Sequence, residues 1–231
     1  MNSSRFIIFF LFYIALFSDC FFIITEHPEY RIYTKTLLVP LLLLLIYIEA
    51  KETKHQRSKI LVNLAFFFCF IGDFLFIKDA DASGNFISGI SSFLIAQLFF
   101  IFFFYRLKAF STKYVLFTLL TVLFIIAYIL ILLFLIWQNV SMQNLEIPVI
   151  LYAIILGLML LSAINTIKNR SIKRLASNYF VPGAALFVLS DSILAINKFY
   201  LSFYYGPVLV MITYGLAIFL LANGVIRFLK K

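Results

Sequence analysis

The chain has 231 residues, of which 64% are hydrophobic and 19% aromatic, and only 13% are charged. Soluble domains typically carry about 25% charged residues, so this composition excludes a soluble globular protein. In a soluble protein the formal net charge of +9 would suggest nucleic-acid binding, but here the charges lie between hydrophobic runs, where they act as topology signals. We therefore expect no nucleic-acid partner.

Hydrophobic runs bounded by charged or turn residues predict eight membrane-spanning helices. In chain order we expect them at about 6–24, 33–50, 60–77, 86–105, 114–136, 147–165, 179–199 and 204–226. The connections between them, such as KETKHQRSK, KDADASGN, WQNVSMQNLE and KNRSIKR, are too short to fold alone. The predicted fold class is therefore all-α, with residues 1–231 forming a single domain, one polytopic bundle of eight transmembrane helices.

The first hydrophobic run resembles a signal sequence, and Cys20 within it resembles a lipoprotein cysteine. Asp19 occupies the position where the cleavage site requires a small residue, so we expect a retained first helix. Cys69 also lies in an apolar run, and no CxxC pair is present. Both cysteines are therefore expected to be packing residues.

Counting Lys and Arg on each side of the eight helices predicts the orientation. One side carries 15 of them: Arg5, Lys51, Lys54, Arg57, Lys59, Arg106, Lys108, Lys113, Lys168, Arg170, Lys173, Arg174, Arg227, Lys230 and Lys231. The other side carries 4: Arg31, Lys35, Lys78 and Lys198. Because cytoplasmic loops are enriched in Lys and Arg, both termini are expected in the cytoplasm, which agrees with an even number of helices.

A weak internal similarity is compatible with a parallel duplication of four helices. The third and seventh helices each carry a small residue followed by Asp, at Gly72-Asp73 and Ser190-Asp191. The second and sixth each have a proline in their first turns, Pro40 and Pro148.

Three carboxylates lie at membrane depth: Asp19, Asp73 and Asp191. An ionisable side chain inside a span costs about 2.5–3.5 kcal/mol on insertion scales, so it faces the bundle interior and indicates a functional site. Counted from the span midpoints, all three fall in one layer, displaced towards the outer face. For Asp19, which has no polar pattern around it, a structural hydrogen bond to a neighbouring helix is the favoured interpretation.

Other polar residues surround this layer. Tyr152 falls at a similar depth, whereas Lys35, Asn197 and Lys198 lie nearer the outer surface. The two lysines also fit a simpler role, in which their stems lie along the bundle and their ammonium groups reach the interface. Gln97 is an ordinary interhelical hydrogen-bonding residue unless other evidence implicates it.

Five segments resemble, in order and spacing, the YhhN proteins of bacteria and their eukaryotic relatives, the lysoplasmalogenases. They are TKTLLVPLLLLL (34–45), FCFIGDFLF (68–76), FLIAQLFFIFFF (93–104), PGAALFVLSDSILAINKF (182–199) and YGPVLVMITYGLAIFLLANG (205–224). The most specific is the segment around Asp191, supported by Gly72-Asp73 and by Thr34-Lys35. One departure is Gln97, where the family often has His.

This resemblance implies an eight-helix membrane enzyme that hydrolyses the vinyl ether bond of a lysoplasmalogen, giving a fatty aldehyde and glycerophosphoethanolamine or glycerophosphocholine. Such hydrolysis needs a general acid and a carboxylate that stabilises a cation and orients water, and Asp73 and Asp191 are the expected catalytic pair. Asp191, nearer the midplane, is the expected acid. The expected substrate-binding residues are Lys35, Asn197, Lys198, Tyr152 and Gln97, with the lysines binding the phosphate.

No cofactor or metal is expected, because His27 and His55 lie in loops on opposite sides of the membrane and cannot join one ligand cluster. The expected location is the bacterial inner membrane, with membrane lipid and a lysophospholipid substrate as partners. The alternative is a small transporter or lipid-binding protein, in which the Asp layer binds protons or a cation. Against it, the helices lack paired Gly or Pro breaks near the midplane.

Overall fold

A computed structural model describes residues 3–78, 83–107 and 115–231. The helices in these ranges are α1 (Ser3–Ile24), α2 (Pro28–Glu49), α3 (Gln56–Lys78), α4 (Ser83–Leu107), α5 (Val115–Met142), α6 (Glu146–Asn165), α7 (Lys173–Leu175), α8 (Val181–Phe199) and α9 (Gly206–Leu229). Two short helical turns, η2 (Thr166–Lys168) and η3 (Ala176–Phe180), lie between α6 and α8. Eight helices in the described part of the chain are long and apolar enough to cross a membrane, which confirms the predicted fold class.

Several helices extend beyond their hydrophobic runs. Helix α2 begins at Pro28, five residues before the expected start, because proline is favoured in the first turn, where its missing N–H is not needed. Pro40 consequently lies in the middle of α2 and not in its first turns. Helix α5 continues to Met142, past the expected end at 136, because backbone hydrogen bonding does not stop where the apolar run does. The expected loop KDADASGN, together with Lys108 and Lys113, lies outside the described side chains.

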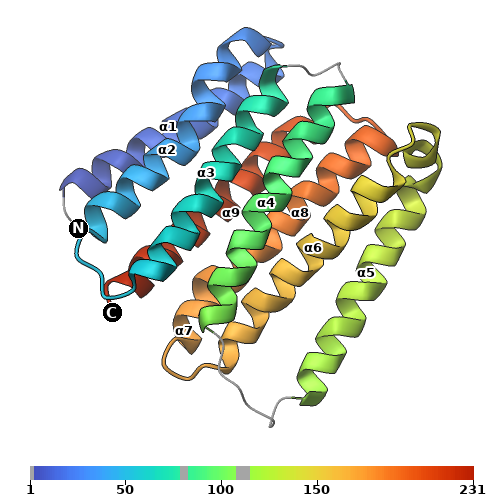
Figure 1. Ribbon diagram of the computed structural model, residues 1–231. Helices are drawn as coiled ribbons and strands as arrows, with labels where there is room; N and C mark the ends of the chain where they lie inside the picture. The colour runs from blue at the N-terminus through green and yellow to red at the C-terminus, as the bar shows by residue number, and fades with distance from the viewer. Residues whose placement is uncertain (1–2, 79–82, 108–114) are drawn as a thin grey trace.

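The helices form two packed layers (Figure 1). Helices α2, α3, α4 and α6 lie side by side in one layer, and α1, α9 and α8 form the second. Helix α5 packs mainly against α6 and α8, at the edge of the bundle. It is the least enclosed span, whereas α9 is the most enclosed. The interior surface between the two layers is therefore built around α9.

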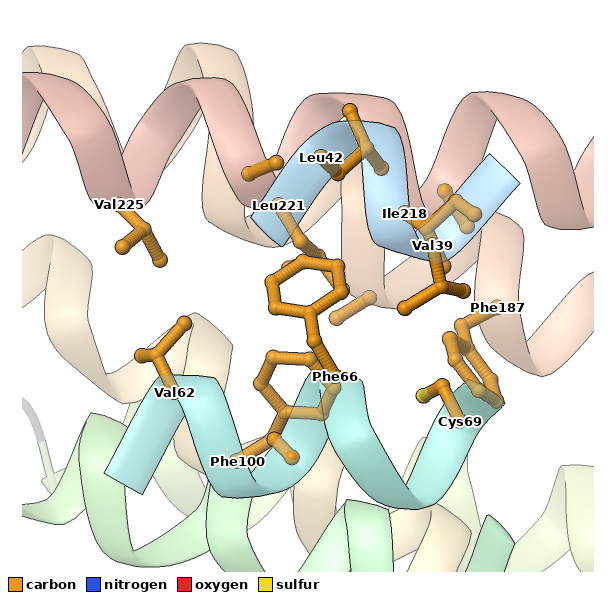
Figure 2. Close-up of a cluster of buried hydrophobic side chains, with 14 of the residues drawn as sticks. Val39, Leu42, Val62, Phe66, Cys69, Phe100, Phe187, Ile218, Leu221 and Val225 are labelled. Carbon is orange, nitrogen blue, oxygen red and sulfur yellow. The ribbon is translucent and has the colours of Figure 1, made fainter. Parts of the chain in front are cut away.

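Apolar side chains from both layers fill this interior (Figure 2). Phe66 of α3 and Phe100 of α4 pack edge to face, with ring centroids 5.6 Å apart, and Leu221 of α9 lies beside them. Cys69 is a free, buried thiol in the same cluster, which confirms it as a packing residue. This packing fixes α3, α4 and α9 relative to one another on the side of Asp73 and Asp191 that faces the termini.

Both termini lie at the same end of the bundle (Figure 1). There Arg5 donates a hydrogen bond to Asn223 over 2.8 Å, and the Thr53 hydroxyl donates to the Leu229 carbonyl over 2.7 Å. A shared end is what an even number of spans requires. The orientation of that end in the membrane stays a prediction.

Candidate active site

A cavity of about 100 Å³ lies between the two layers, near the end opposite the termini. Six helices line it: α2, α3, α4, α6, α8 and α9. Its polar residues are Lys35, Asp73, Tyr152, Ser190, Asp191 and Tyr214, and the rest of the described wall is apolar. The two carboxylates expected to form a catalytic pair therefore line one cavity.

Asp73, on α3, is completely buried. Its Oδ2 accepts a hydrogen bond of 2.7 Å from the Tyr214 hydroxyl of α9. Its Oδ1 lies 3.6 Å from the Lys35 ammonium nitrogen of α2 and has no hydrogen-bond partner. Because the Lys35 side chain is only 12% exposed, it points into the bundle towards Asp73 and does not reach out to the interface.

Asp191, on α8, is held from α4 and α6. The Tyr152 hydroxyl donates to its Oδ2 over 2.5 Å, and the Gln97 amide donates to the same oxygen over 3.3 Å. Gln97 also donates to the Tyr152 hydroxyl oxygen over 2.9 Å. Both of these described donors approach Oδ2. The other oxygen, Oδ1, can therefore form a hydrogen bond with a molecule in the cavity. Gln97 itself is buried behind this wall, and its Oε1 has no hydrogen-bond partner.

The two carboxyl groups differ in their charged neighbours. Asp73 forms an ion pair with Lys35, whereas no ion pair to Asp191 is found in the part of the chain that the structure describes. An opposite charge stabilises a carboxylate in apolar surroundings, so the site favours ionisation of Asp73 over ionisation of Asp191. In the same described residues, no group of three or more His, Cys, Asp and Glu side chains is placed to hold a metal ion.

The small residues before the two aspartates pack against other helices, and not against each other. A Cβ added at Gly72 would lie 2.7 Å from the Phe93 ring of α4. The Ser190 hydroxyl donates to the Val210 carbonyl of α9 over 3.0 Å. These contacts turn the next side chain along each helix, Asp73 or Asp191, into the cavity.

Three of the expected substrate-binding residues lie outside the cavity lining: Gln97, described above, and also Asn197 and Lys198. Asn197 closes the turn after α8, where its Oδ1 accepts the Phe203 N–H over 3.0 Å. Lys198 is exposed, and its ammonium nitrogen lies 4.4 Å from the ring centroid of Phe86. Because the Phe86 ring also lines the cavity, Lys198 lies close to the cavity but behind its wall.

Asp19 belongs to a separate cluster. Its carboxylate accepts a hydrogen bond of 2.9 Å from the Thr34 hydroxyl and bonds of 3.4 and 3.2 Å from the Arg31 guanidinium. Asp19 does not line the cavity. The structural interpretation favoured for it from the sequence agrees with these contacts.

Sequence reasoning missed Tyr214. Its ring packs edge to face against Phe93 and Phe187, with ring centroids 5.8 Å apart in each pair. The ring therefore resembles an ordinary core aromatic, and the hydrogen bond from its hydroxyl to Asp73 is what places it in the site. The signal available in the sequence was a Tyr-Gly pair inside the last of the five segments that resemble the YhhN proteins.

Comparison with known proteins identifies the family. The family model described as the YhhN family matches residues 30–225. No curated protein and no solved structure matches the chain. The matched range includes every residue that contributes a polar group to the cavity. Because the match covers most of the chain, the protein is a multi-pass membrane protein that belongs to the YhhN family.

Proposed function

We propose that this protein is a membrane hydrolase that cleaves the vinyl ether bond of a lysoplasmalogen, releasing a fatty aldehyde and a glycerophospho-ethanolamine or -choline. The observation that carries the proposal is the placement of two carboxyl groups, Asp73 and Asp191, on one largely apolar cavity. Lys35 forms an ion pair with Asp73, and no described residue forms one with Asp191. This is the asymmetry that a general acid and a charge-stabilising carboxylate require.

Asp191 is the proton donor in this proposal. Tyr152 and Gln97 both donate to its Oδ2, so they fix the carboxyl group in one orientation and leave Oδ1 to carry the proton. In the first step this proton passes to the alkene carbon distant from the ether oxygen. The positive charge that forms is shared between the ether oxygen and the carbon bonded to it.

Asp73 stabilises that cation and takes a proton from the attacking water. Its ion pair with Lys35 and its hydrogen bond from Tyr214 keep it ionised before the reaction. Oδ1, which is buried without a hydrogen-bond donor, is the oxygen that accepts from the water. As water adds to the cationic carbon, its proton moves to Asp73 and a hemiacetal forms.

The hemiacetal then breaks down, and both carboxyl groups return to their starting states. Asp191 takes the proton of the hemiacetal hydroxyl as the carbonyl forms, and Asp73 gives its proton to the departing glycerol oxygen. One water is consumed, and one aldehyde and one alcohol are released. Each step uses only side chains of the cavity wall.

The cavity, at about 100 Å³, fits the vinyl ether and glycerol portion of a lipid and not a whole molecule, because drug-sized ligands occupy about 300–1,000 Å³. The phosphate lies towards Lys35, whose ammonium group is a compact hydrogen-bond donor. The alkenyl chain lies against the aromatic wall formed by residues such as Phe76 and Phe93. With both termini in the cytoplasm of a bacterial cell, this cavity opens in the outer half of the inner membrane.

The test uses purified protein with three lysophospholipids that share one headgroup and differ at the sn-1 bond. The vinyl ether substrate should release aldehyde, measured by reduction with alcohol dehydrogenase and NADH. The saturated alkyl ether should release none, because it has no alkene to protonate, and should inhibit competitively. Release of fatty acid from the acyl analogue without aldehyde from the vinyl ether would contradict the proposal. Binding of all three lipids without turnover would favour a lipid-binding protein.

A further inference from the structure

A second hollow, of about 680 Å³, lies at the end of the bundle that carries the termini. It is bounded by the start of α1, by α7 and η3, and by the end of α9. Five of its described lining residues are cationic: Arg5, Arg174, Arg227, Lys230 and Lys231. None of the described lining residues is acidic. We refer to this site as the basic hollow.

Close packing between α9 and η3 shapes the basic hollow. A Cβ added at Gly224 would lie 2.8 Å from the Tyr179 Cβ and 2.7 Å from the Phe180 ring, so glycine allows the two elements to touch. One turn later on α9, the Arg227 guanidinium lies 4.9 Å from the Tyr179 ring centroid. A guanidinium stacked on an aromatic ring keeps its N–H groups directed outward in a fixed plane.

Arg5 contributes to the basic hollow from α1. Its guanidinium donates to Asn223 over 2.8 Å and lies 5.1 Å from the ring centroid of Phe9. Its Nε is buried and has no hydrogen-bond partner. An unsatisfied buried donor on a charged group is costly, and an acceptor entering the basic hollow offers the missing bond.

The cations in the basic hollow outnumber the available anions. Lys230 pairs with Glu49. Among the described residues, no ion pair is found for Arg5, Arg174 or Arg227. Guanidinium groups that line one hollow without counter-ions match a phosphate group, which accepts paired N–H bonds.

We propose that the basic hollow binds the phosphate of an anionic phospholipid. A lipid is favoured over a soluble phosphate because the basic hollow lies where α1 begins and α9 ends, at the membrane boundary. Beside Arg5, Phe6 and Phe10 are 59% and 58% exposed on α1, and they offer a surface for acyl chains. Basic pockets at this level between helices are typical headgroup sites. The site is at the opposite end from the catalytic cavity, so it does not depend on the proposed reaction.

The experiment measures the melting temperature of the purified full chain in neutral detergent, with added phosphatidylglycerol, phosphatidylcholine or inorganic phosphate at equal concentration. Phosphatidylglycerol should raise the melting temperature by about 5 °C through linkage, and the other two should raise it little. The double variant Arg174→Gln/Arg227→Gln should lose most of that rise. The matched control is Lys54→Gln/Arg57→Gln, which removes two exposed cations at the same end outside the basic hollow, and it should keep the full rise.

Replacing Arg227 also removes its contact with Tyr179, which could alter the fold. The single variant Arg174→Gln avoids this problem because Arg174 is exposed. This variant should lose part of the rise in melting temperature. Equal rises in the basic-hollow variants and the control variant would overturn the proposal. So would an equal effect of phosphatidylcholine, which would indicate general lipid stabilisation. An equal effect of inorganic phosphate would overturn the assignment to a lipid.

Discussion

Replacing Tyr214 by Phe removes one hydroxyl from the catalytic cavity and leaves the packing intact. The ring contacts of Tyr214 with Phe93 and Phe187 are retained by phenylalanine, so the variant is expected to fold. What it loses is the 2.7 Å hydrogen bond to Asp73 Oδ2. Among the described residues, Asp73 then keeps the Lys35 ammonium group, 3.6 Å away, to stabilise its ionised form.

The size of the effect follows from the charge of the acceptor. Hydrogen bonds to charged groups contribute about 1.5–3 kcal/mol, and each 1.36 kcal/mol in the activation free energy changes the rate about tenfold. If the lost stabilisation appears in the transition state, kcat for vinyl ether hydrolysis should fall about 10- to 150-fold. KM should change much less, because the hydroxyl already has its partner within the protein.

The matched control is Tyr128→Phe. Tyr128 also donates a 2.7 Å hydrogen bond to a side chain of α8, Ser192, but it does not line the catalytic cavity. Initial rates of aldehyde release should therefore stay within about threefold of the parent protein, as expected for a site away from the reacting groups. If Tyr214→Phe, with an unchanged melting temperature, is as active as Tyr128→Phe, the role assigned to the Asp73–Tyr214 bond is wrong.

Three further predictions follow from the same geometry. Lys35→Met should lower kcat at least about tenfold as well as raise KM, because it removes the counter-ion of Asp73. A change in KM alone would mean that Lys35 binds the phosphate and does not support Asp73. Asp19→Asn should lower the free energy of unfolding by about 1–3 kcal/mol through the loss of its bonds to Arg31, with kcat almost unchanged, and a large loss of turnover at normal stability would place Asp19 in the site. A cysteine at Lys54 should react with an impermeant maleimide only after cells are opened, and labelling of intact cells would reverse the orientation.

The eight spans were predictable because insertion in a membrane depends on runs of apolar residues, which composition and order reveal directly. Helix ends were less predictable. Helix α2 starts at Pro28 within a segment that looked like a polar loop, and α5 runs on through polar residues to Met142. In both cases the chain satisfies its backbone hydrogen bonds by continuing the helix beyond the apolar segment.

The pairing of the site residues was harder to predict than their depth. Helical rise placed Asp73 and Asp191 in one layer, and the structure puts both on one cavity. Rise along a helix does not give the direction in which a side chain points. Asn197, one layer higher, turns into a loop cap, whereas Lys35 turns inward to Asp73. Tyr214 was missed because one hydroxyl among 13 tyrosines carries no signal until its partner is known.

The most direct test of the account compares Asp73→Asn, Asp191→Asn and the double variant in aldehyde release from a vinyl ether lysophospholipid. Melting temperature and monodisperse elution are measured alongside, because a structural role predicts loss of folded protein instead of loss of turnover. If the two carboxyl groups act as a unit, each single variant should lose at least about 1,000-fold in kcat and the double variant little more. A well-folded single variant that retains near-normal vinyl ether hydrolysis would contradict the two-aspartate mechanism.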